Sequence, residues 1–254
     1  TNYLGGILHQ CAHYGFGDGL NGPEYIQTLL DAFPNELEYR LNTTVIGIHA
    51  DKTAVLSSAE YGVQTICFSQ LILAAGCREI PAGALDIAGT RPMGVYTAGQ
   101  MQEMINVYGI LPQSPVVILG SGDIGLIMAK QIAKIGGEVA LVEQNSVLGG
   151  LERNQWGIEQ YAIPVYFDTT ITELHGEKHL SAVTLGNGAE LPCKTLLIAN
   201  KFYIVLSSIV CQFFYFGSSK PIGRCYVGVR IQLKYMFCIQ VKKVHLIGSH
   251  SGCI

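Results

Sequence analysis

The last part of the chain lacks acidic residues. Residues 201–254 contain seven Lys and Arg but no Asp or Glu, a net charge of +7. Residues 1–200 carry nine Lys and Arg and 19 Asp and Glu, a net charge of −10, so the total of −3 averages two unlike segments. Globular segments usually mix both signs of charge, which predicts a different origin for residues 201–254. The first 200 residues show no basic cluster, which argues against a nucleic-acid partner.

Closely spaced cysteines are also missing. The chain has eight cysteines, and the smallest gap, between Cys67 and Cys77, is ten residues. This spacing excludes a CxxC redox dithiol or a zinc knuckle, so we expect no metal site. Scattered reduced thiols are typical of the cytosol, and we predict a cytoplasmic location.

Long hydrophobic runs are scarce, and no signal peptide is visible. Residues 202–219 are uncharged over 18 positions, but this run barely reaches membrane-spanning length and contains Ser and Gln. A membrane anchor is therefore an alternative that we do not favour. With 49% hydrophobic and 14% charged residues, the composition excludes a disordered chain. The length allows one large domain or two smaller ones.

Apolar periodicity predicts an α/β fold. Pro23 suits the first turn of one helix, and Thr97 with Gln100 forms a capping box before another. We expect four helices, at 23–33, 97–109, 123–135 and 151–162. We expect strands at 43–48, 53–58, 63–68, 71–76, 116–119, 139–142, 164–174 and 195–199, with a hairpin over 179–193.

A glycine-rich loop separates the predicted strand 116–119 from the predicted helix 123–135. It consists of Gly120, Ser121, Gly122, Asp123, Ile124 and Gly125. In this strand–loop–helix context the GxGxxG spacing indicates a dinucleotide site. Gly120 allows the tight turn, Gly122 lets the backbone approach a pyrophosphate, and Gly125 lets the helix pack closely on the strand. The start of the helix then offers N–H groups to the phosphates.

Glu143 ends the next strand, 18 residues after Gly125. An acid at this place accepts hydrogen bonds from a ribose 2′-hydroxyl group. The next arginine is Arg153, so a 2′-phosphate would meet a carboxylate and no nearby cation. The pattern favours NAD over NADP.

Four segments taken together resemble the pyridine nucleotide–disulfide oxidoreductase family, flavoproteins with two dinucleotide-binding domains, in the branch without a redox-active disulfide. The resemblance covers about residues 3–199. Its segments are GGILHQC (5–11), LILAAGCREIP (71–81), TRPMGVYTAG (90–99) and VVILGSGDIG (116–125).

The resemblance implies an α/β architecture in which a Rossmann-like NAD(P)-binding domain is inserted in a partial FAD-binding domain of the same class. The implied divisions are residues 1–109 for the FAD domain, 110–200 for the NAD(P) domain and 201–254 for the atypical basic tail. The implied cofactors are FAD and NAD. The implied flavin contacts are Gly5, Gly6, Gln10, Val45, Ala75 and Gly76.

The family reaction would be hydride transfer between NAD(P)H and flavin, in which the protein positions the two rings. That step needs no catalytic acid, base or nucleophile, so we assign none. The expected partners are a small-molecule substrate or a partner oxidoreductase subunit. One alternative is a nicotinamide-binding module, or an inactive remnant, without flavin.

Two departures from the family pattern lead us to expect a fragment. The first GxGxxG unit of the family, which binds the FAD pyrophosphate, is not in this sequence, and neither is its C-terminal Gly-Asp motif. Ala75 also replaces the usual Thr. The family pattern stops near Asn200, where a run rich in Cys, Phe and Tyr begins. We expect the tail to be non-native, as a frameshift or a retained intron would make it.

Overall fold

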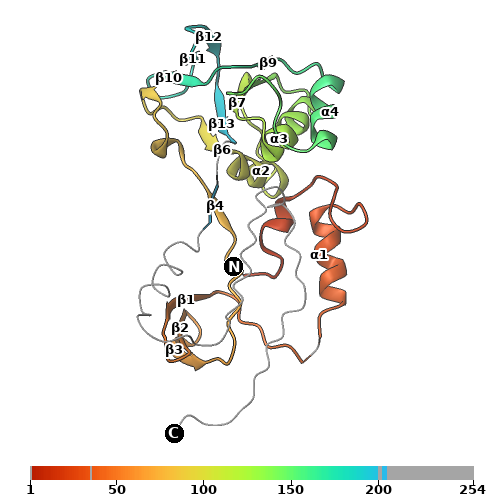
Figure 1. Cartoon of the computed structure of the whole chain (residues 1–254), viewed down its shortest axis with the longest axis vertical. Coiled ribbons are helices and arrows are strands. Elements are labelled where there is room, and N and C mark those ends of the chain that lie inside the picture. Colours follow the sequence, from red (N-terminus) through yellow and green to blue (C-terminus); the bar gives the residue numbers. More distant parts are fainter. Residues whose placement is uncertain (1, 35, 200–201, 205–254) are drawn as a thin grey trace, which may run out of the picture. The chain divides into compact units, whose positions relative to one another are not determined.

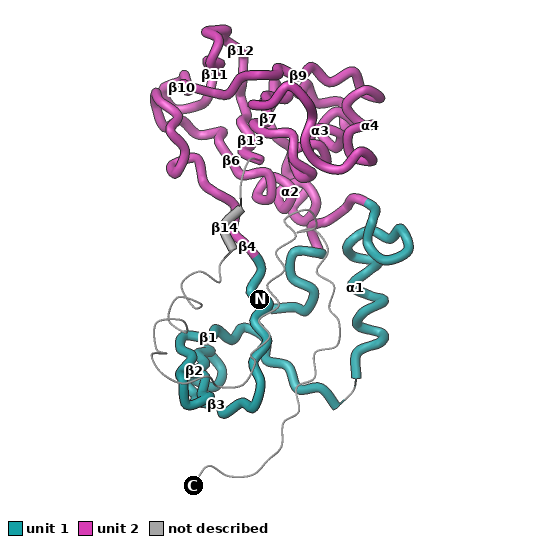
Figure 2. Tube along the Cα trace, viewed as in Figure 1, with its two compact units in different colours: residues 1–8, 14–76, 204–254 teal, residues 9–13, 77–203 magenta. Residues whose placement is uncertain are grey.

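A computed structural model describes residues 2–34, 36–199 and 202–204. Apart from residues 202–204, the predicted tail 201–254, which includes the uncharged run 202–219, lies outside the described residues. Figure 2 shows two compact units: unit 1 contains residues 1–8 and 14–76, and unit 2 contains residues 9–13 and 77–203. Each unit is described by itself.

Unit 1 contains the helix α1 (Gly22–Asp31), close to the predicted 23–33. The side chain of Asn21 accepts a hydrogen bond from the Glu24 N–H group, and the Glu24 carboxylate accepts one from the Asn21 N–H group. This reciprocal capping box starts the helix just before Pro23. Ile26 is the buried apolar residue of α1.

Three antiparallel strands follow in unit 1, and they confirm the predicted strands. They form a meander in the order β1-β2-β3, with bounds Thr43–Ile48, Thr53–Ser58 and Gly62–Cys67. The pairing of β1 with β2 is irregular between Val45 and Gly47. Ala54 and Leu56 of β2 are buried, whereas every residue of β3 is exposed.

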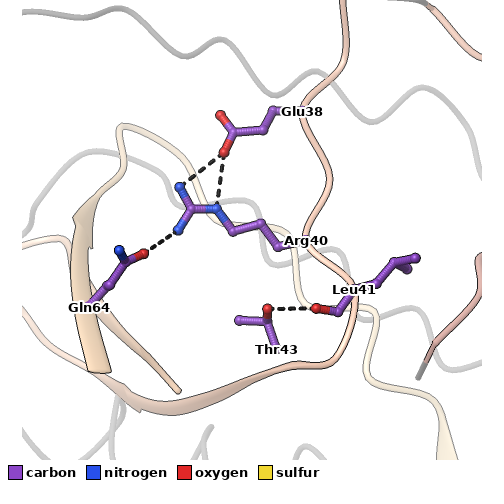
Figure 3. A network of polar contacts seen from close by, with 5 residues as sticks. All are labelled: Glu38, Arg40, Leu41, Thr43 and Gln64. Carbon is purple, nitrogen blue, oxygen red and sulfur yellow. Dashed lines mark hydrogen bonds and ion pairs between the residues drawn. The ribbon is translucent and has the colours of Figure 1, made fainter. Parts of the chain in front are cut away.

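A short polar network fastens the chain before β1 to this sheet (Figure 3). Arg40 lies between Glu38, at 3.0 Å, and Gln64 of β3, whose Oε1 accepts a hydrogen bond of 2.8 Å. The Thr43 hydroxyl donates to the carbonyl oxygen of Leu41. The ion pair is exposed to solvent, so its contribution to the free energy of unfolding is small, at most about 1 kcal/mol.

The strand predicted at 71–76 is wrong. These residues are irregular, and Leu71 and Ile72 are exposed. A continuous apolar run becomes a buried parallel strand only when neighbouring strands and covering layers enclose it. No strand pairs with residues 71–76 in the described part of the chain.

Unit 2 is built on a five-stranded, wholly parallel Rossmann-like sheet (Figure 1). Its order is β6-β13-β7-β8-β9, and every neighbouring pair is parallel. The strand bounds are Val95–Thr97, Thr195–Ile198, Val116–Leu119, Val139–Val142 and Val165–Tyr166. The predicted strands at 116–119, 139–142 and 195–199 are confirmed.

Three helices and a second sheet cover the parallel sheet. The helices are α2 (Ala98–Asn106), α3 (Asp123–Lys134) and α4 (Glu152–Gln160). In Figure 1 they lie together on one side, and β10–β12 lie on the other. The second sheet has the order β12-β11-β10-β5, with bounds Glu190–Pro192, Ala182–Leu185, Ile171–His175 and Ala88–Gly89.

Short elements complete the described chain. The 3₁₀ helix η1 (Gly6–Gln10) crosses from unit 1 into unit 2, and a second one, η2, covers Ala82–Ala84. β4 (Cys77–Glu79) pairs with β14 (Phe202–Ile204). No helix among the described residues is long and apolar enough to span a membrane.

The core between the two sheets explains why the central strands are uniformly apolar. Val117 and Leu119 of β7 and Leu196 of β13 pack with Leu174 and Val183 of the second sheet. Because side chains alternate along a strand, Val116 and Ile118 face the helices instead. All four residues of β7 and all four of β13 are buried.

The structure divides the predicted strand 164–174 in two. β9 pairs with β8 in the parallel sheet, whereas β10 pairs with β11 and β5 in the second sheet. The chain therefore changes sheets between Tyr166 and Ile171. Asp168 adopts a φ of 53°, in the left-handed region, at this change of direction.

The chain passes from one compact unit to the other between residues 76 and 77. The domain division predicted at residue 109 stays a prediction. Residues 77–109 join unit 2 because β6 pairs with β13 and α2 packs against α3. The functional roles of the predicted domains stay predictions.

Replacing Leu196 with Ala should lower the free energy of unfolding of unit 2 by about 2–5 kcal/mol, because the fully buried side chain would leave a cavity between the sheets. Leu111→Ala is the control, since Leu111 is exposed and its loss should cost no more than about 0.5 kcal/mol. Urea unfolding followed by the fluorescence of Trp156, the single tryptophan, measures both. Equal effects of the two substitutions would contradict the described core.

Candidate dinucleotide-binding site

The glycine-rich loop lies where β7 ends and α3 begins, at the carboxyl edge of the parallel sheet. Gly120 has a φ of 102°, a conformation that other residues rarely adopt, so the turn out of β7 requires glycine. A Cβ atom on Gly125 would overlap the carbonyl oxygen of Gly120 and would lie 3.2 Å from the Ala199 Cβ atom. Gly125 therefore allows α3 to pack directly against the ends of β7 and β13.

Gly122 differs from these two glycines. Its φ of −63° suits any residue, and a Cβ atom there would meet only the Ala199 carbonyl oxygen, at an ordinary 3.7 Å. The fold itself does not demand glycine at this position. The open space beside the loop is what a pyrophosphate needs for close approach to the backbone.

The beginning of α3 has no side-chain cap, whereas α1 and α2 each have a full capping box. The first N–H groups of a helix have no intrahelical acceptor, and together with the helix dipole they attract phosphate. The loop thus fits the pyrophosphate of a dinucleotide. Ile124 is buried beneath it and contributes packing.

Glu143 follows β8 and is only 6% exposed. Its Oε2 atom accepts hydrogen bonds from the Ser121 N–H group, at 2.9 Å, and the Ser121 hydroxyl, at 2.6 Å. Its Oε1 atom accepts hydrogen bonds from the Asn145 N–H group, at 2.9 Å, and the Asn145 Nδ2 atom, at 2.7 Å. The structure therefore brings the predicted acid and the predicted loop together.

Two opposing effects set the pKa of Glu143. Burial raises it, but the hydrogen bonds from Ser121 and Asn145 outweigh burial and hold the pKa below its ordinary value of 4.5. The carboxylate is therefore charged at neutral pH.

The loop between β8 and α4 folds onto the glycine-rich loop, which the sequence did not predict. The Gly149 N–H group donates to the Ser121 hydroxyl oxygen, at 2.7 Å. The Leu151 N–H group and the Asn154 Nδ2 atom both donate to Asp123 Oδ1, each at 2.7 Å. The Gly149-Gly150 pair signals a turn, but sequence spacing does not say onto which residues the turn folds.

His13 and Arg153 lie near the same loop. Burial lowers the pKa of His13, the positive charge of Arg153 lowers it further, and the negative charge of Asp123 partly opposes them. Arg153 occupies the first turn of α4, next to Asn154. The positive charge of Arg153 and the negative charge of Asp123 thus both act on His13.

The residues that the resemblance assigned to flavin are divided between the units. Gln10 belongs to unit 2, where its Nε2 atom lies 3.4 Å from the Gly99 carbonyl oxygen and 3.5 Å from Gln102 Oε1. Its own carbonyl oxygen accepts a hydrogen bond from Asn106, at 2.7 Å. Gln10 thereby fastens residues 9–13 to α2.

The other assigned residues, Gly5, Gly6, Val45, Ala75 and Gly76, lie in unit 1. Gly5 and Gly6, at the start of η1, have positive φ angles of 102° and 53°. Val45 is exposed on β1, and Ala75 and Gly76 are exposed in the irregular segment before β4. Their flavin role stays a prediction.

Cys11 of unit 2 is buried. Burial raises the pKa of its thiol to about 11, so the thiol stays protonated at neutral pH. No cluster of three potential metal-binding side chains occurs within the described ranges.

The parallel sheet, the glycine-rich loop and the acid after β8 together define a dinucleotide-binding α/β protein. Residues 7–200 match the family described as pyridine nucleotide-disulphide oxidoreductase. The chain belongs to this family, whose members use FAD and NAD(P).

Two curated proteins are similar in sequence. Hydrogen cyanide synthase subunit HcnB from Pseudomonas protegens is 29% identical over 209 residues, which are 72% of this chain and 43% of that protein. An opine oxidase subunit from Agrobacterium tumefaciens is 30% identical over 125 residues, 45% of this chain and 24% of that protein. The chain thus matches less than half the length of either relative.

Solved structures share the fold. Thioredoxin reductase from T. acidophilum has a TM-score of 0.58 at 16% identity, and the match covers 81% of this chain and 68% of that chain. The NAD-dependent persulfide reductase from A. fulgidus has a TM-score of 0.53 at 19% identity, covering 67% of this chain and 33% of that chain. At these identities the likeness shows the fold alone.

The depressed pKa of Glu143 makes stability depend on pH. The charged carboxylate should stabilise the fold fully above its ordinary value of 4.5, and this contribution should fall as the pH falls through the lower pKa of the folded state. The difference in free energy of unfolding between the wild type and Glu143→Gln should therefore shrink on acidification below pH 4.5. Urea unfolding at a series of pH values measures it, and a difference that is constant with pH would contradict the assignment.

Proposed function

We propose that unit 2 binds NAD(H), in preference to NADP(H), and that the chain belongs to an FAD-dependent oxidoreductase in which hydride passes between the nicotinamide and the flavin. The observation that carries this proposal is the open space at Gly122 beside the uncapped start of α3. The chain's own groups bind and orient the dinucleotide. The N–H groups of the loop hold the pyrophosphate, and the flavin supplies the redox chemistry when it is bound.

The preference for NAD(H) rests on charge. Glu143 is buried, ionised and held in place at the carboxyl end of β8. A ribose 2′-hydroxyl is neutral, whereas a 2′-phosphate would approach this fixed negative charge at a cost. Arg153 in the first turn of α4 is the nearby cation that would oppose this preference, so the measurement includes NADPH.

We further propose that the chain works with a partner oxidoreductase subunit, which binds the small-molecule substrate that is oxidised. Both curated relatives are named as subunits, one of a hydrogen cyanide synthase and one of an opine oxidase. This supports a multisubunit assembly for the present chain. The cytoplasm is the proposed location, since the eight cysteines are scattered without any closely spaced pair.

Gly122→Ala should weaken NADH binding about tenfold or more, because the added methyl group would stand where the pyrophosphate approaches the backbone. The matched control is Gly83→Ala in η2, where the added Cβ would meet nothing within 4 Å. Quenching of Trp156 fluorescence by NADH measures the Kd, with thermal unfolding to show that both variants fold. Unchanged NADH affinity of the Gly122→Ala variant would contradict the proposal that the pyrophosphate binds at this loop.

The second candidate function is a nicotinamide-binding module without flavin, since the glycine-rich loop and Glu143 both lie within unit 2. Under the first function, the purified chain should show flavin absorbance in the visible range that NADH bleaches without oxygen. Saturable NADH binding by a colourless chain, unchanged after incubation with FAD, would instead support the module.

A further inference from the structure

The carboxylate of Glu143 is saturated by the protein itself. A carboxylate offers about four acceptor positions. Two donors of Ser121 and two of Asn145 occupy them, at 2.6–2.9 Å. A ribose hydroxyl therefore finds no acceptor position open on Glu143 while this network is intact.

A further hydrogen bond, from the loop between β8 and α4, holds Ser121 in this network. The Ser121 hydroxyl that donates to Glu143 also accepts a hydrogen bond from the Gly149 N–H group, at 2.7 Å. Ser121 is fully buried. Moving the carboxylate toward a ligand would break its two buried hydrogen bonds from Ser121, and unpaired buried polar groups are costly.

Asn145 presents an acceptor, its amide oxygen, that does not take part in these four hydrogen bonds. Its Nδ2 atom faces Glu143 Oε1, because the amide oxygen would be repelled by the carboxylate. In a planar amide the Oδ1 atom then points away from Glu143. Asn145 is exposed at the carboxyl end of β8, the edge where a dinucleotide binds such a sheet.

We propose that Asn145, not Glu143, accepts the hydrogen bond from the 2′-hydroxyl of the adenosine ribose, and that Glu143 is a positioning residue. Glu143 fixes the orientation of the Asn145 amide and places a negative charge behind it, which disfavours a 2′-phosphate. This inference rests on the proposed binding of a dinucleotide at the loop, and it names the residue that determines specificity there.

The substitution Asn145→Ala distinguishes the two residues that could accept the hydrogen bond from the ribose 2′-hydroxyl, because each assignment predicts a different effect. If Asn145 accepts this hydrogen bond, the variant loses it, and the Kd for NADH rises about threefold to tenfold. The Kd for NADPH then stays constant. If Glu143 accepts the ribose hydrogen bond instead, loss of the Asn145 side chain frees an acceptor position on Glu143 Oε1, and NADH binds with unchanged or higher affinity. The latter result would overturn the inference.

The experiment uses the full chain and titrates NADH and NADPH against Trp156 fluorescence. Asn187→Ala, at the exposed turn between β11 and β12, is the control for loss of an asparagine side chain, and it should change neither Kd. Thermal unfolding shows that each variant folds. A wild-type chain that binds neither dinucleotide would refute the proposed function itself, a result distinct from an Asn145→Ala variant that keeps full NADH affinity.

Glu143→Gln tests the positioning role separately. Without the fixed charge, the ratio of the NADPH Kd to the NADH Kd should fall by about threefold or more. A residue needed only for folding would weaken both dinucleotides alike and leave this ratio unchanged. An unchanged ratio would therefore count against the role assigned to Glu143.

Discussion

The close approach of α3 to the ends of β7 and β13 is the contact on which the rest of unit 2 depends. One methyl group on residue 125 would overlap the carbonyl oxygen of Gly120 and crowd Ala199. Because residue 125 has no Cβ atom to separate it from Gly120 and Ala199, the first turn of α3 lies directly at the carboxyl edge of the sheet. Its N–H groups and the Ser121 side chain then occupy fixed positions next to β8. Without this contact, the loop and Glu143 would not meet.

The buried carboxylate of Glu143 is the second consequence of that geometry. A buried charge is costly unless hydrogen bonds satisfy it, and here four donors do so. The same donors connect three segments: the glycine-rich loop, the end of β8 and the turn that leads to α4. The charge therefore connects these loops and places a negative charge at the carboxyl edge of the sheet.

Local sequence patterns predicted most elements of unit 2 well. The strand–loop–helix–strand unit from Val116 to Val142 is confirmed, as are the capping box at Thr97 and the hairpin around Asn187. These features depend on residues near one another in sequence, such as glycines with special φ angles or apolar residues at regular spacing. The pairing of Gly120–Gly125 with Glu143 was predictable for the same reason, because one β-α-β unit places them together.

Features that depend on distant partners were not predictable. Residues 71–76 have the composition of a buried strand, but burial is decided by neighbours, and no described strand pairs with them. The break between β9 and β10 arises because two sheets compete for the chain, a competition that periodicity within residues 164–174 does not reveal. The fold of the β8–α4 loop onto Ser121 and Asp123 is likewise a matter of tertiary contact.

The sequence by itself determined the glycine-rich loop between strand and helix and the acid after β8, since each is encoded by residue type at fixed spacing within one supersecondary unit. Only the tertiary structure decided how the acid is used. It showed that Ser121 and Asn145 donate four hydrogen bonds to the Glu143 carboxylate and that Asn145 is exposed at this edge. The physical reason is that hydrogen-bond saturation depends on the direction of donors from several segments, and sequence spacing does not fix those directions.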